Sequence, residues 1–178
     1  MRVVGLAGRS GAGKTTVAEA VIARLRQRGL RVSVVKHAHH EFEIDTPGKD
    51  TWRHRQAGAF EVVIASDQRL ALLREFERTA SLSVHHLIAE LYEGVDWVIV
   101  EGFKDSDLPK IEVIRPSTGQ PAQYDEDPFV LAVATDDAAA LPWPTDRPVL
   151  NLNDPEGLTA WLIDNQDRFD YLPERYLP

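Results

Sequence analysis

The residues nearest the amino terminus that can do chemistry form a phosphate-binding motif. Eight consecutive residues fit the pattern G-x-x-x-x-G-K-[S/T], in which glycines let phosphate oxygens approach the backbone. The motif consists of Gly8, Arg9, Ser10, Gly11, Ala12, Gly13, Lys14 and Thr15. Its backbone amides, continuing to Thr16, can face one concavity and bind anionic oxygens, while Lys14 adds a positive charge between the β- and γ-phosphates. The spacing therefore predicts a nucleotide site in which Lys14 is the catalytic cation and Thr15 offers its hydroxyl to Mg²⁺.

A second requirement of such a site is a carboxylate at the end of a nearby strand, where it supports the Mg²⁺ shell. The apolar run 98–100 ends in Glu101, and Gly102 then lets the chain turn beside the phosphates. We predict that Glu101 holds the metal, although an ordinary carboxylate at the end of a strand is the alternative. Asp45 and Asp50, in a later loop, are further candidates, and Asp45 is predicted to hold Mg²⁺ or to position a water molecule.

The residues that would read the base carry a weaker signal. The apolar strand predicted over Phe129–Ala134 is followed by Thr135 and Asp136, and an Asp carboxylate can accept hydrogen bonds from both N1–H and the 2-amino group of guanine. The signature Asn/Thr-Lys-x-Asp is incomplete, because its Lys is missing. Thr135 and Asp136 are therefore predicted to line the base site, with Asn151 and Asn153 as further candidates.

Three histidines that follow the second predicted strand resemble a metal-binding cluster. His37, His39 and His40 lie close together, but the chain has no Cys and the three have no fixed helical spacing. A dedicated zinc or nickel site is therefore not expected, and a solvated or phosphate-adjacent loop is favoured. Whether these side chains bind anything is left open by the sequence.

The elements that must position the phosphate loop form a β-α-β unit. Val3–Ala7 is a short apolar run typical of a buried parallel strand, and Lys14–Arg28 places apolar residues on one helical face. Gly29 ends that helix, and Arg31–Lys36 is a second strand. This order predicts an α/β fold of the phosphate-loop NTPase type, with a mainly parallel sheet flanked by helices.

Further elements alternate along the rest of the chain. Arg69–Phe76 is ambiguous between strand and helix, and Gly119–Pro128 is the predicted mobile loop because it is polar, acidic and closed by Pro at both ends. Helices are predicted over 50–57, 81–92 and 156–163, and strands over 60–65, 97–100, 110–114, 129–134 and 148–152.

Composition limits the possible partners. The chain has 178 residues, enough for one domain, and a net charge of −8, which argues against a general nucleic-acid binder. Residues 1–60 nevertheless carry 11 Lys and Arg against 5 Asp and Glu, a balance that suits a small anion, although solvated arginines at a helix end explain it equally well. No apolar run has the length of a signal peptide or membrane span, so we expect a soluble, cytoplasmic protein with no membrane partner.

Several segments together resemble one family, the MobB proteins, which are adapter proteins of molybdopterin-guanine dinucleotide biosynthesis. The block Asp-Thr-Pro-Gly-Lys-Asp from Asp45, followed by Arg-His-Arg-x-Ala-Gly-Ala from Arg53, is far more specific than the phosphate loop, which many families share. The resemblance covers residues 1–165 and is densest from 1 to 115. The segments that carry it are residues 3–16, 36–40, 45–51, 53–59 and 100–104.

This resemblance implies a GTP-binding homodimer with slow intrinsic GTPase activity at most. It implies one nucleotide-binding domain over 1–165, with residues 166–178 as a tail outside the matched part. The implied partners are the guanylyltransferase MobA, which attaches GMP to molybdopterin, and other proteins of molybdenum cofactor assembly. The implied fold carries a small antiparallel extension that builds the dimer. We expect strands 69–76 and 110–114 at the sheet margin, where pairing across a two-fold axis buries Leu70, Leu72 and Ile111. The alternative is that these strands only complete the sheet of a single chain.

Two other functions use the same motif. A small-molecule kinase would need the same loop and Mg²⁺, but residues 121–178 hold only 3 Lys and Arg against 12 Asp and Glu, which argues against an arginine-rich lid. A metal-insertion GTPase is suggested by the loop histidines and weakened by the lack of Cys. An accessory GTP-binding protein of molybdenum cofactor assembly is the interpretation that the sequence favours.

Overall fold

The computed structural model describes residues 1–178 except 39–41, 79 and 177–178. The chain divides into two compact units, which are described separately. The first contains residues 1–37 and 83–178, and the second contains residues 38–82.

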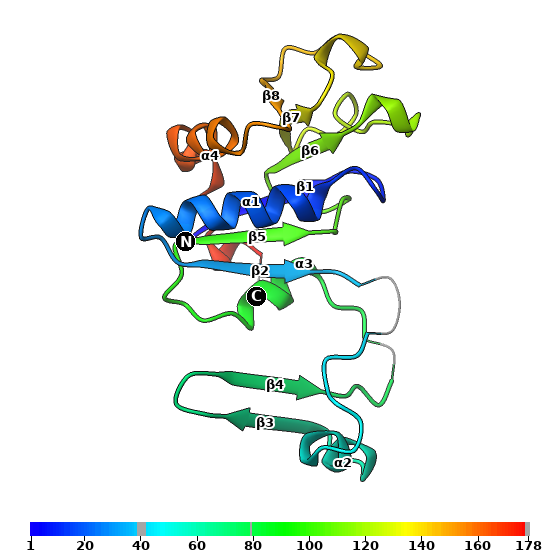
Figure 1. The fold of residues 1–178 in the computed structure, drawn as a ribbon, viewed down its shortest axis with the longest axis vertical. Coiled ribbons are helices and arrows are strands. Elements are labelled where there is room, and N and C mark those ends of the chain that lie inside the picture. The colour runs from blue at the N-terminus through cyan, green and yellow to red at the C-terminus, as the bar shows by residue number, and fades with distance from the viewer. Residues whose placement is uncertain (39–41, 79, 177–178) are drawn as a thin grey trace. The chain divides into compact units, whose positions relative to one another are not determined.

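The first unit is built on a six-stranded parallel sheet (Figure 1). Its strands are β1 (Arg2–Ala7), β2 (Val32–Lys36), β5 (Trp97–Glu101), β6 (Lys110–Ile114), β7 (Val130–Thr135) and β8 (Val149–Asn151). The strand order is β2-β5-β1-β6-β7-β8 and every neighbouring pair is parallel. All carboxyl ends therefore meet at one edge, where parallel α/β sheets bind their ligands. The mainly parallel α/β fold predicted from the sequence is confirmed.

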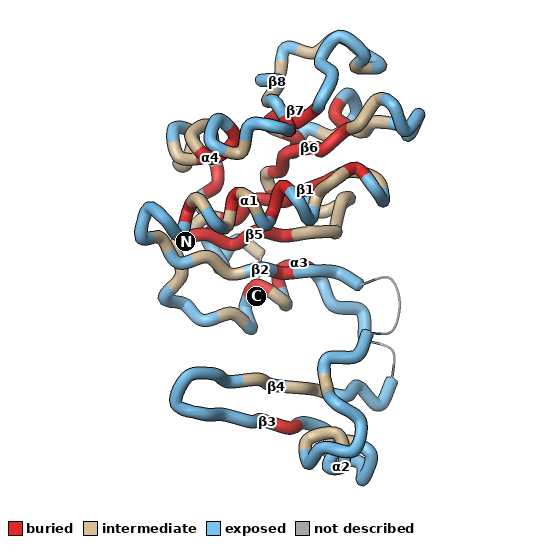
Figure 2. Tube along the Cα trace, in the orientation of Figure 1, coloured by how far each residue is buried: buried red, intermediate tan, exposed pale blue. Residues whose placement is uncertain are grey.

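Helices cover both faces of this sheet (Figure 2). On one face α1 (Lys14–Gln27) and α4 (Pro155–Asp164) pack with alternate side chains of β1, β5 and β6 into the largest apolar cluster. The other face buries Val3, Val98 and Val100 against the short helix α3 (Val84–Ala89). The sequences of β1, β5 and β7 are almost continuously apolar because both faces of these strands are covered.

Two sequence expectations about elements of this unit need correction. The helix predicted over 81–92 spans only Val84–Ala89. Its start is fixed by Ser83, whose side chain accepts a hydrogen bond from the His86 N–H and caps the helix. The expectation that residues 110–114 form a marginal strand is wrong. They form β6, which lies between β1 and β7, and Ile111 is already buried within one chain.

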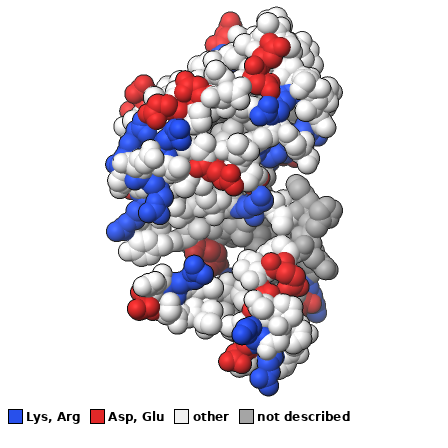
Figure 3. Space-filling model, viewed as in Figure 1, with Lys and Arg blue, Asp and Glu red and all other residues white. Residues whose placement is uncertain are grey.

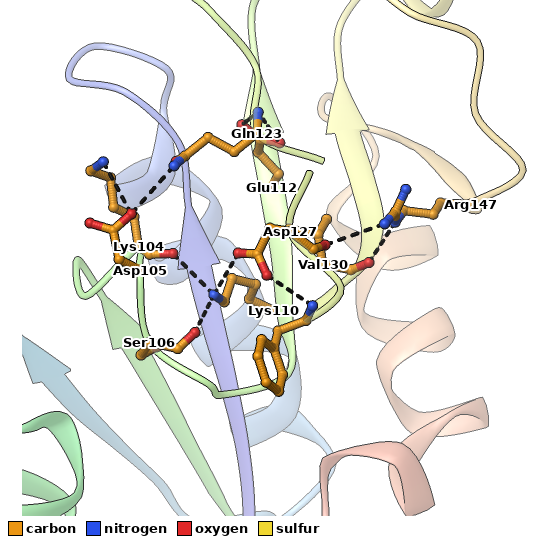
Figure 4. A network of polar contacts seen from close by, with 10 residues as sticks. Lys104, Asp105, Ser106, Lys110, Glu112, Gln123, Asp127, Val130 and Arg147 are labelled. Atoms are coloured by element: carbon orange, nitrogen blue, oxygen red, sulfur yellow. Dashed lines mark hydrogen bonds and ion pairs between the residues drawn. The ribbon is translucent and has the colours of Figure 1, made fainter. Parts of the chain in front are cut away.

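The charged side chains of Lys110 and Glu112 in β6 are buried, and each has hydrogen-bond partners from neighbouring loops (Figure 4). Lys110 is 1% exposed, and its ammonium donates hydrogen bonds to Lys104 O at 3.0 Å, to Ser106 O and to Asp127 Oδ2 at 2.8 Å. A buried ammonium is tolerated only when its donors are used in this way. Lys110 therefore ties the residues before β6 to the residues before β7.

The segment predicted to be a mobile loop, Gly119–Pro128, is anchored at its centre. The Gln123 N–H donates to both carboxylate oxygens of Glu112, at 2.9 and 3.0 Å. Tyr124 is completely buried, and its hydroxyl donates to Trp143 O at 2.6 Å. Burial raises the pKa of Glu112, although the N–H donors of Gln123 and Tyr124 oppose this shift.

The carboxyl-terminal residues pack into the first unit. Phe169 is fully buried and contacts the Trp97 ring, with 5.7 Å between centroids. The Tyr171 hydroxyl is 2.9 Å from His85 Nδ1, and His85 Nε2 is 2.8 Å from Asp107 Oδ1. Burial raises the pKa of Tyr171 to about 12. His85 is therefore a packed side chain that joins α3 to the end of the chain.

The second unit contains one helix and one hairpin. Helix α2 (Asp50–Gln56) is followed by β3 (Glu61–Ala65) and β4 (Leu70–Arg74), which pair antiparallel. The ambiguous segment 69–76 is therefore a strand over most of its length, and the small antiparallel extension is confirmed. Among the described residues, no helix is both long and apolar enough to cross a lipid bilayer.

Replacing Lys110 by Met tests how strongly this network stabilises the fold. The substitution leaves Asp127 and two carbonyl oxygens without their cation, so we expect the free energy of unfolding to fall by about 3–5 kcal/mol. The matched control is Lys104→Met, because Lys104 is exposed and its partner Asp105 is more exposed still. That control is expected to cost less than about 1 kcal/mol in the same urea titration. Equal losses in the two variants would contradict a structural role for the Lys110 network.

Candidate nucleotide-binding site

The phosphate loop follows β1 at the carboxyl edge of the sheet and needs its glycines. Gly8 has a φ of +127°, and a Cβ there would lie 2.3 Å from Val113 O of β6. Gly13 has a φ of +98° and caps α1, while the space around Gly11 is open. A side chain at Gly8 would therefore clash with β6, and one at Gly13 would press on the Arg115 side chain, so the loop needs glycine at both positions to keep this path. Ala12 is buried, Ser10 and Thr16 are exposed, and Arg9 Nε is buried without a hydrogen-bond partner among the described residues.

The amino end of α1 is prepared for an anion. Its first turn contains no acidic residue, and no side chain caps its free N–H groups. Unpaired amides and the helix dipole both favour negative charge at such an end. The 14-residue helix is held by burial of Val17, Ala18, Val21 and Leu25, so its amino end has a fixed position in the unit.

Lys14 lies over the loop that precedes it. Its ammonium donates to Gly8 O at 2.9 Å and to Arg9 O at 2.8 Å. Burial lowers the pKa of Lys14, Glu101 opposes this shift, and the neighbouring positive charge of Lys36 adds to it. A bound phosphate would supply the negative charge that this partly desolvated cation lacks.

Thr15 and Glu101 meet across the sheet edge, as a Mg²⁺ site requires. The Thr15 hydroxyl donates to Glu101 Oε1 at 2.7 Å, although 86 residues separate the two in the chain. Lys36, at the end of β2, places its ammonium 3.3 Å from the same oxygen. A hydroxyl and a carboxylate beside a phosphate loop are the hard oxygen ligands that Mg²⁺ prefers, so these residues fit the metal. Lys36 was not singled out from the sequence, although its position at a strand end was a signal.

The turn after Glu101 is tight. Gly102 has a φ of +96°, and a Cβ there would lie 2.9 Å from His37 Cβ. Phe103 has a φ of +47°, which is uncommon for a residue other than glycine, and its ring centroid is 4.7 Å from that of His37. Strained backbone of this kind is frequent at functional sites. Here the strained turn after β5 packs against His37, the residue that follows β2.

His37 is a packed neighbour of this turn, whereas His39 and His40 lie outside the described residues. Within the part of the chain that the structure describes, no cluster of three or more His, Asp or Glu side chains is suited to hold a metal ion.

The residues predicted to read the base lie at the end of β7. Thr135 is buried, and its hydroxyl accepts a hydrogen bond from the Asp137 N–H at 3.2 Å. Asp137 in turn caps a short 3₁₀ turn by accepting from the Ala139 N–H. Asn151 lies opposite Thr135 in the pairing of β7 with β8, and its side chain accepts from the Asn153 N–H. Of these side chains, Asp136 is the one whose carboxylate is engaged by a cation near the loop.

That cation is Arg115, which was not singled out from the sequence. Arg115 Nη1 donates to Asp136 Oδ2 at 2.6 Å. The Arg115 guanidinium also flanks the phosphate loop, because a Cβ on Gly13 would lie 3.4 Å from Arg115 Nε. Arg115 could have been recognised as a candidate from its position directly after a predicted buried strand, since ligands bind at the carboxyl ends of parallel strands.

Asp45 and Asp50 belong to the second unit. The Asp45 carboxylate accepts from the Thr51 hydroxyl at 2.6 Å, from the Thr46 N–H at 3.0 Å and from Arg55 at 3.4 Å. The Thr51 hydrogen bond is the main cause of a lowered pKa for Asp45. Asp50 is at the start of α2, where Arg53 is 3.8 Å away. Both carboxylates thus have partners inside their own unit.

Comparison with known proteins identifies the family. The family described as "Molybdopterin guanine dinucleotide synthesis protein B", or MobB, matches residues 3–136. The "molybdopterin-guanine dinucleotide biosynthesis adapter protein" of Haemophilus influenzae is 40% identical over 153 residues, which cover 85% of this chain and 82% of that protein. Its namesake in Escherichia coli K12 is 37% identical over 157 residues and 87% of each chain.

Solved structures agree with this match. The crystal structure of a MobB protein homologue from Bacillus stearothermophilus superposes with a TM-score of 0.70 at 27% identity, over 93% of this chain and 97% of that one. A crystal structure of molybdopterin-guanine biosynthesis protein B gives a TM-score of 0.69 at 26% identity, over 92% and 99% of the two chains. Sequence and fold thus converge, and this chain belongs to the MobB family.

Proposed function

We propose that this protein is a GTP-binding accessory protein that assists the conversion of molybdopterin to molybdopterin guanine dinucleotide. The observation that carries the proposal is the meeting of Thr15 with Glu101 beside Lys14 and the open amino end of α1, in a chain of the MobB family. Related proteins are named adapters, which favours assistance to an enzyme over independent catalysis.

The nucleotide would be held by residues of the first unit. Backbone amides of the phosphate loop and of Thr16 would bind its phosphates, and Lys14 would neutralise them. Thr15 and Glu101 would hold Mg²⁺, which neutralises developing charge on the phosphate oxygens. Thr135 and Asp136 would form the base site and select GTP. Asp45 stays a candidate for holding Mg²⁺ or positioning a water molecule, which would require it to give up its hydrogen bonds to Thr51 and Arg55.

The kinase alternative lacks a corresponding feature. No cluster of arginines follows β7, where the chain is acidic, and the charged side chains of Figure 3 mix both signs. Phe103 and Lys104, rather than a water-positioning Gln, follow the Glu101–Gly102 turn. We therefore infer slow intrinsic hydrolysis, in which GTP is held more than it is turned over.

The protein is proposed to act in the cytoplasm as a homodimer and to meet MobA and other molybdenum-cofactor proteins. Support for the dimer comes from the hairpin of the second unit. Val63 of β3 pairs with Leu72 of β4, Ala65 pairs with Leu70, and these residues share one face of the hairpin. Leu70 is 67% exposed and Leu72 is 43% exposed. An isolated hairpin with an exposed apolar face is marginal, so a second copy that covers it would stabilise it.

Lys14→Ala is expected to weaken GTP binding by about 10- to 100-fold, because charge-assisted hydrogen bonds contribute about 1.5–3 kcal/mol. The measurement is calorimetric titration with GTP, GDP and ATP in Mg²⁺. The control is Arg26→Ala, which removes an exposed positive charge near the other end of α1 and should bind normally. Unchanged affinity in Lys14→Ala, with both variants folded, would reject the phosphate loop as the binding site.

Glu101→Gln is expected to weaken GTP binding several-fold in Mg²⁺ and to leave binding in EDTA almost unchanged. The substitution keeps the size of the side chain and removes one negative charge from the proposed metal site, which matters only when the metal is present. Titration of each protein with GTP under both conditions supplies the comparison. An equal loss in EDTA would assign Glu101 a structural role instead.

Leu72→Lys is expected to convert the dimer into a monomer, because it would bury an unpaired ammonium in the proposed interface. Light scattering at micromolar concentration should give the wild type a mass near twice the 19.9 kDa of one chain and the variant a mass near 19.9 kDa. Gln68→Lys, in the exposed turn between the two strands, adds the same charge and should stay dimeric. A dimeric Leu72→Lys protein would move the interface to another surface.

A further inference from the structure

Arg115 has a backbone that is fixed more firmly than that of an ordinary loop residue. It directly follows β6, and its carbonyl accepts hydrogen bonds from the Thr118 N–H at 3.0 Å and the Thr118 hydroxyl at 2.8 Å. Pro116 begins the short 3₁₀ turn Pro116–Thr118 and further restricts the chain. The Arg115 side chain therefore leaves the sheet edge from a defined position.

Its guanidinium lies between two parts of the proposed nucleotide site. On one side is the phosphate loop, where a Cβ added to Gly13 would be 3.4 Å from Arg115 Nε and 3.5 Å from Nη2. On the other side is Asp136, which accepts from Nη1 at 2.6 Å. Because β6 lies between β1 and β7 in the sheet, a residue at the end of β6 is well placed to bridge the two.

The two acidic residues that follow β7, Asp136 and Asp137, make different interactions. The Asp137 carboxylate caps a 3₁₀ turn, and the Asp137 N–H is bound by the Thr135 hydroxyl. Asp136 uses Oδ2 for Arg115, and a carboxylate has acceptor sites for about four hydrogen bonds. Asp136 can therefore accept further donors while Arg115 fixes its orientation.

We propose that Arg115 is the positioning residue for base selection: it supplies, from β6, the cation that the Thr135–Asp136 signature lacks. This inference rests on the proposed function and adds to it the residue that determines specificity. Arg115 holds the Asp136 carboxylate beside the phosphate loop, so that a base attached to loop-bound phosphates meets two fixed acceptors. Guanine offers N1–H and a 2-amino group to those acceptors, whereas adenine offers no donor at either position.

The pair is suited to this task because it is partly open. The exposed fraction is 34% for the Arg115 side chain and 23% for that of Asp136, so a ligand can reach both. A planar guanidinium also fixes a carboxylate by direction as well as by charge, which a Lys ammonium does less well.

The test measures base preference in the full-length protein. Affinities for GTP, ATP and xanthosine triphosphate are measured in Mg²⁺ for the wild type, Arg115→Ala, Arg115→Lys, Asp136→Asn and the double variant Arg115→Ala/Asp136→Asn. Arg26→Ala is the control for the loss of one positive charge. Thermal unfolding confirms that each variant is folded.

We expect Arg115→Ala to lose about tenfold in GTP affinity with little change for ATP, since about 1.4 kcal/mol of oriented hydrogen bonding corresponds to tenfold. Arg115→Lys should recover part of that loss. Asp136→Asn should weaken GTP and strengthen xanthosine triphosphate, because the 2-oxo group of xanthine accepts from an amide N–H. The double variant should discriminate no worse than Asp136→Asn alone, because Arg115 acts through Asp136.

Three results would overturn the inference, and they separate it from the proposed function. If Asp136→Asn changes base preference and Arg115→Ala does not, Asp136 reads the base without Arg115. If Arg115→Ala weakens GTP and ATP equally, Arg115 is a phosphate contact and not a specificity residue. If Asp136→Asn leaves the ratio of GTP to ATP affinity unchanged while Lys14→Ala weakens GTP binding as expected, the phosphate-binding part of the site is supported. The base-reading role of Asp136 is then rejected, and the role of Arg115 with it.

Discussion

The close approach of the phosphate loop to β6 is the constraint on which the site depends. At Gly8 the backbone passes so near Val113 O that a Cβ would lie 2.3 Å from that oxygen. No side chain fits there, and φ is in the region that only glycine adopts freely. With the loop pressed onto β6 on one side, the start of α1 is directed toward the end of β5 on the other. Thr15 consequently reaches Glu101, and Gly13 lies against Arg115.

In the proposed function, this arrangement would divide the site into a metal side and a base side. On the metal side, β5 and β2 bring Glu101 and Lys36 to the Thr15 hydroxyl. On the base side, β6 and β7 bring Arg115 and Asp136 together. The sheet order β2-β5-β1-β6-β7 places these two pairs on opposite sides of β1. A nucleotide that lies along the carboxyl edge can then be read at its phosphates and at its base by different strands.

The sequence predicted the parts of this site that local chemistry specifies. The phosphate loop and the strand that ends in Glu101 each have a motif of adjacent residues, so they could be found without knowing the fold. The placement of β6 could not, because strand order is a property of the whole sheet. Residues 110–114 were expected at the sheet margin, yet Lys110 and Glu112 are buried in β6 and bound by partners from 104–127. Arg115 was missed for the same reason, since its importance depends on which strands lie beside β6.

The energies of two ion pairs support different roles for the two cations near β6. Lys110 is buried and Asp127 is half-buried, and removing one partner from a buried pair costs about 3–5 kcal/mol, so we expect this pair to matter for the fold. Arg115 and Asp136 are partly exposed, and pairs of that kind contribute about 0–1 kcal/mol to stability. The fold therefore gains little from Arg115, although its backbone is held by Thr118 and Pro116. A firmly held cation that adds little stability and borders the phosphate loop is better explained by the carboxylate it orients for a ligand than by a contribution to the stability of the sheet.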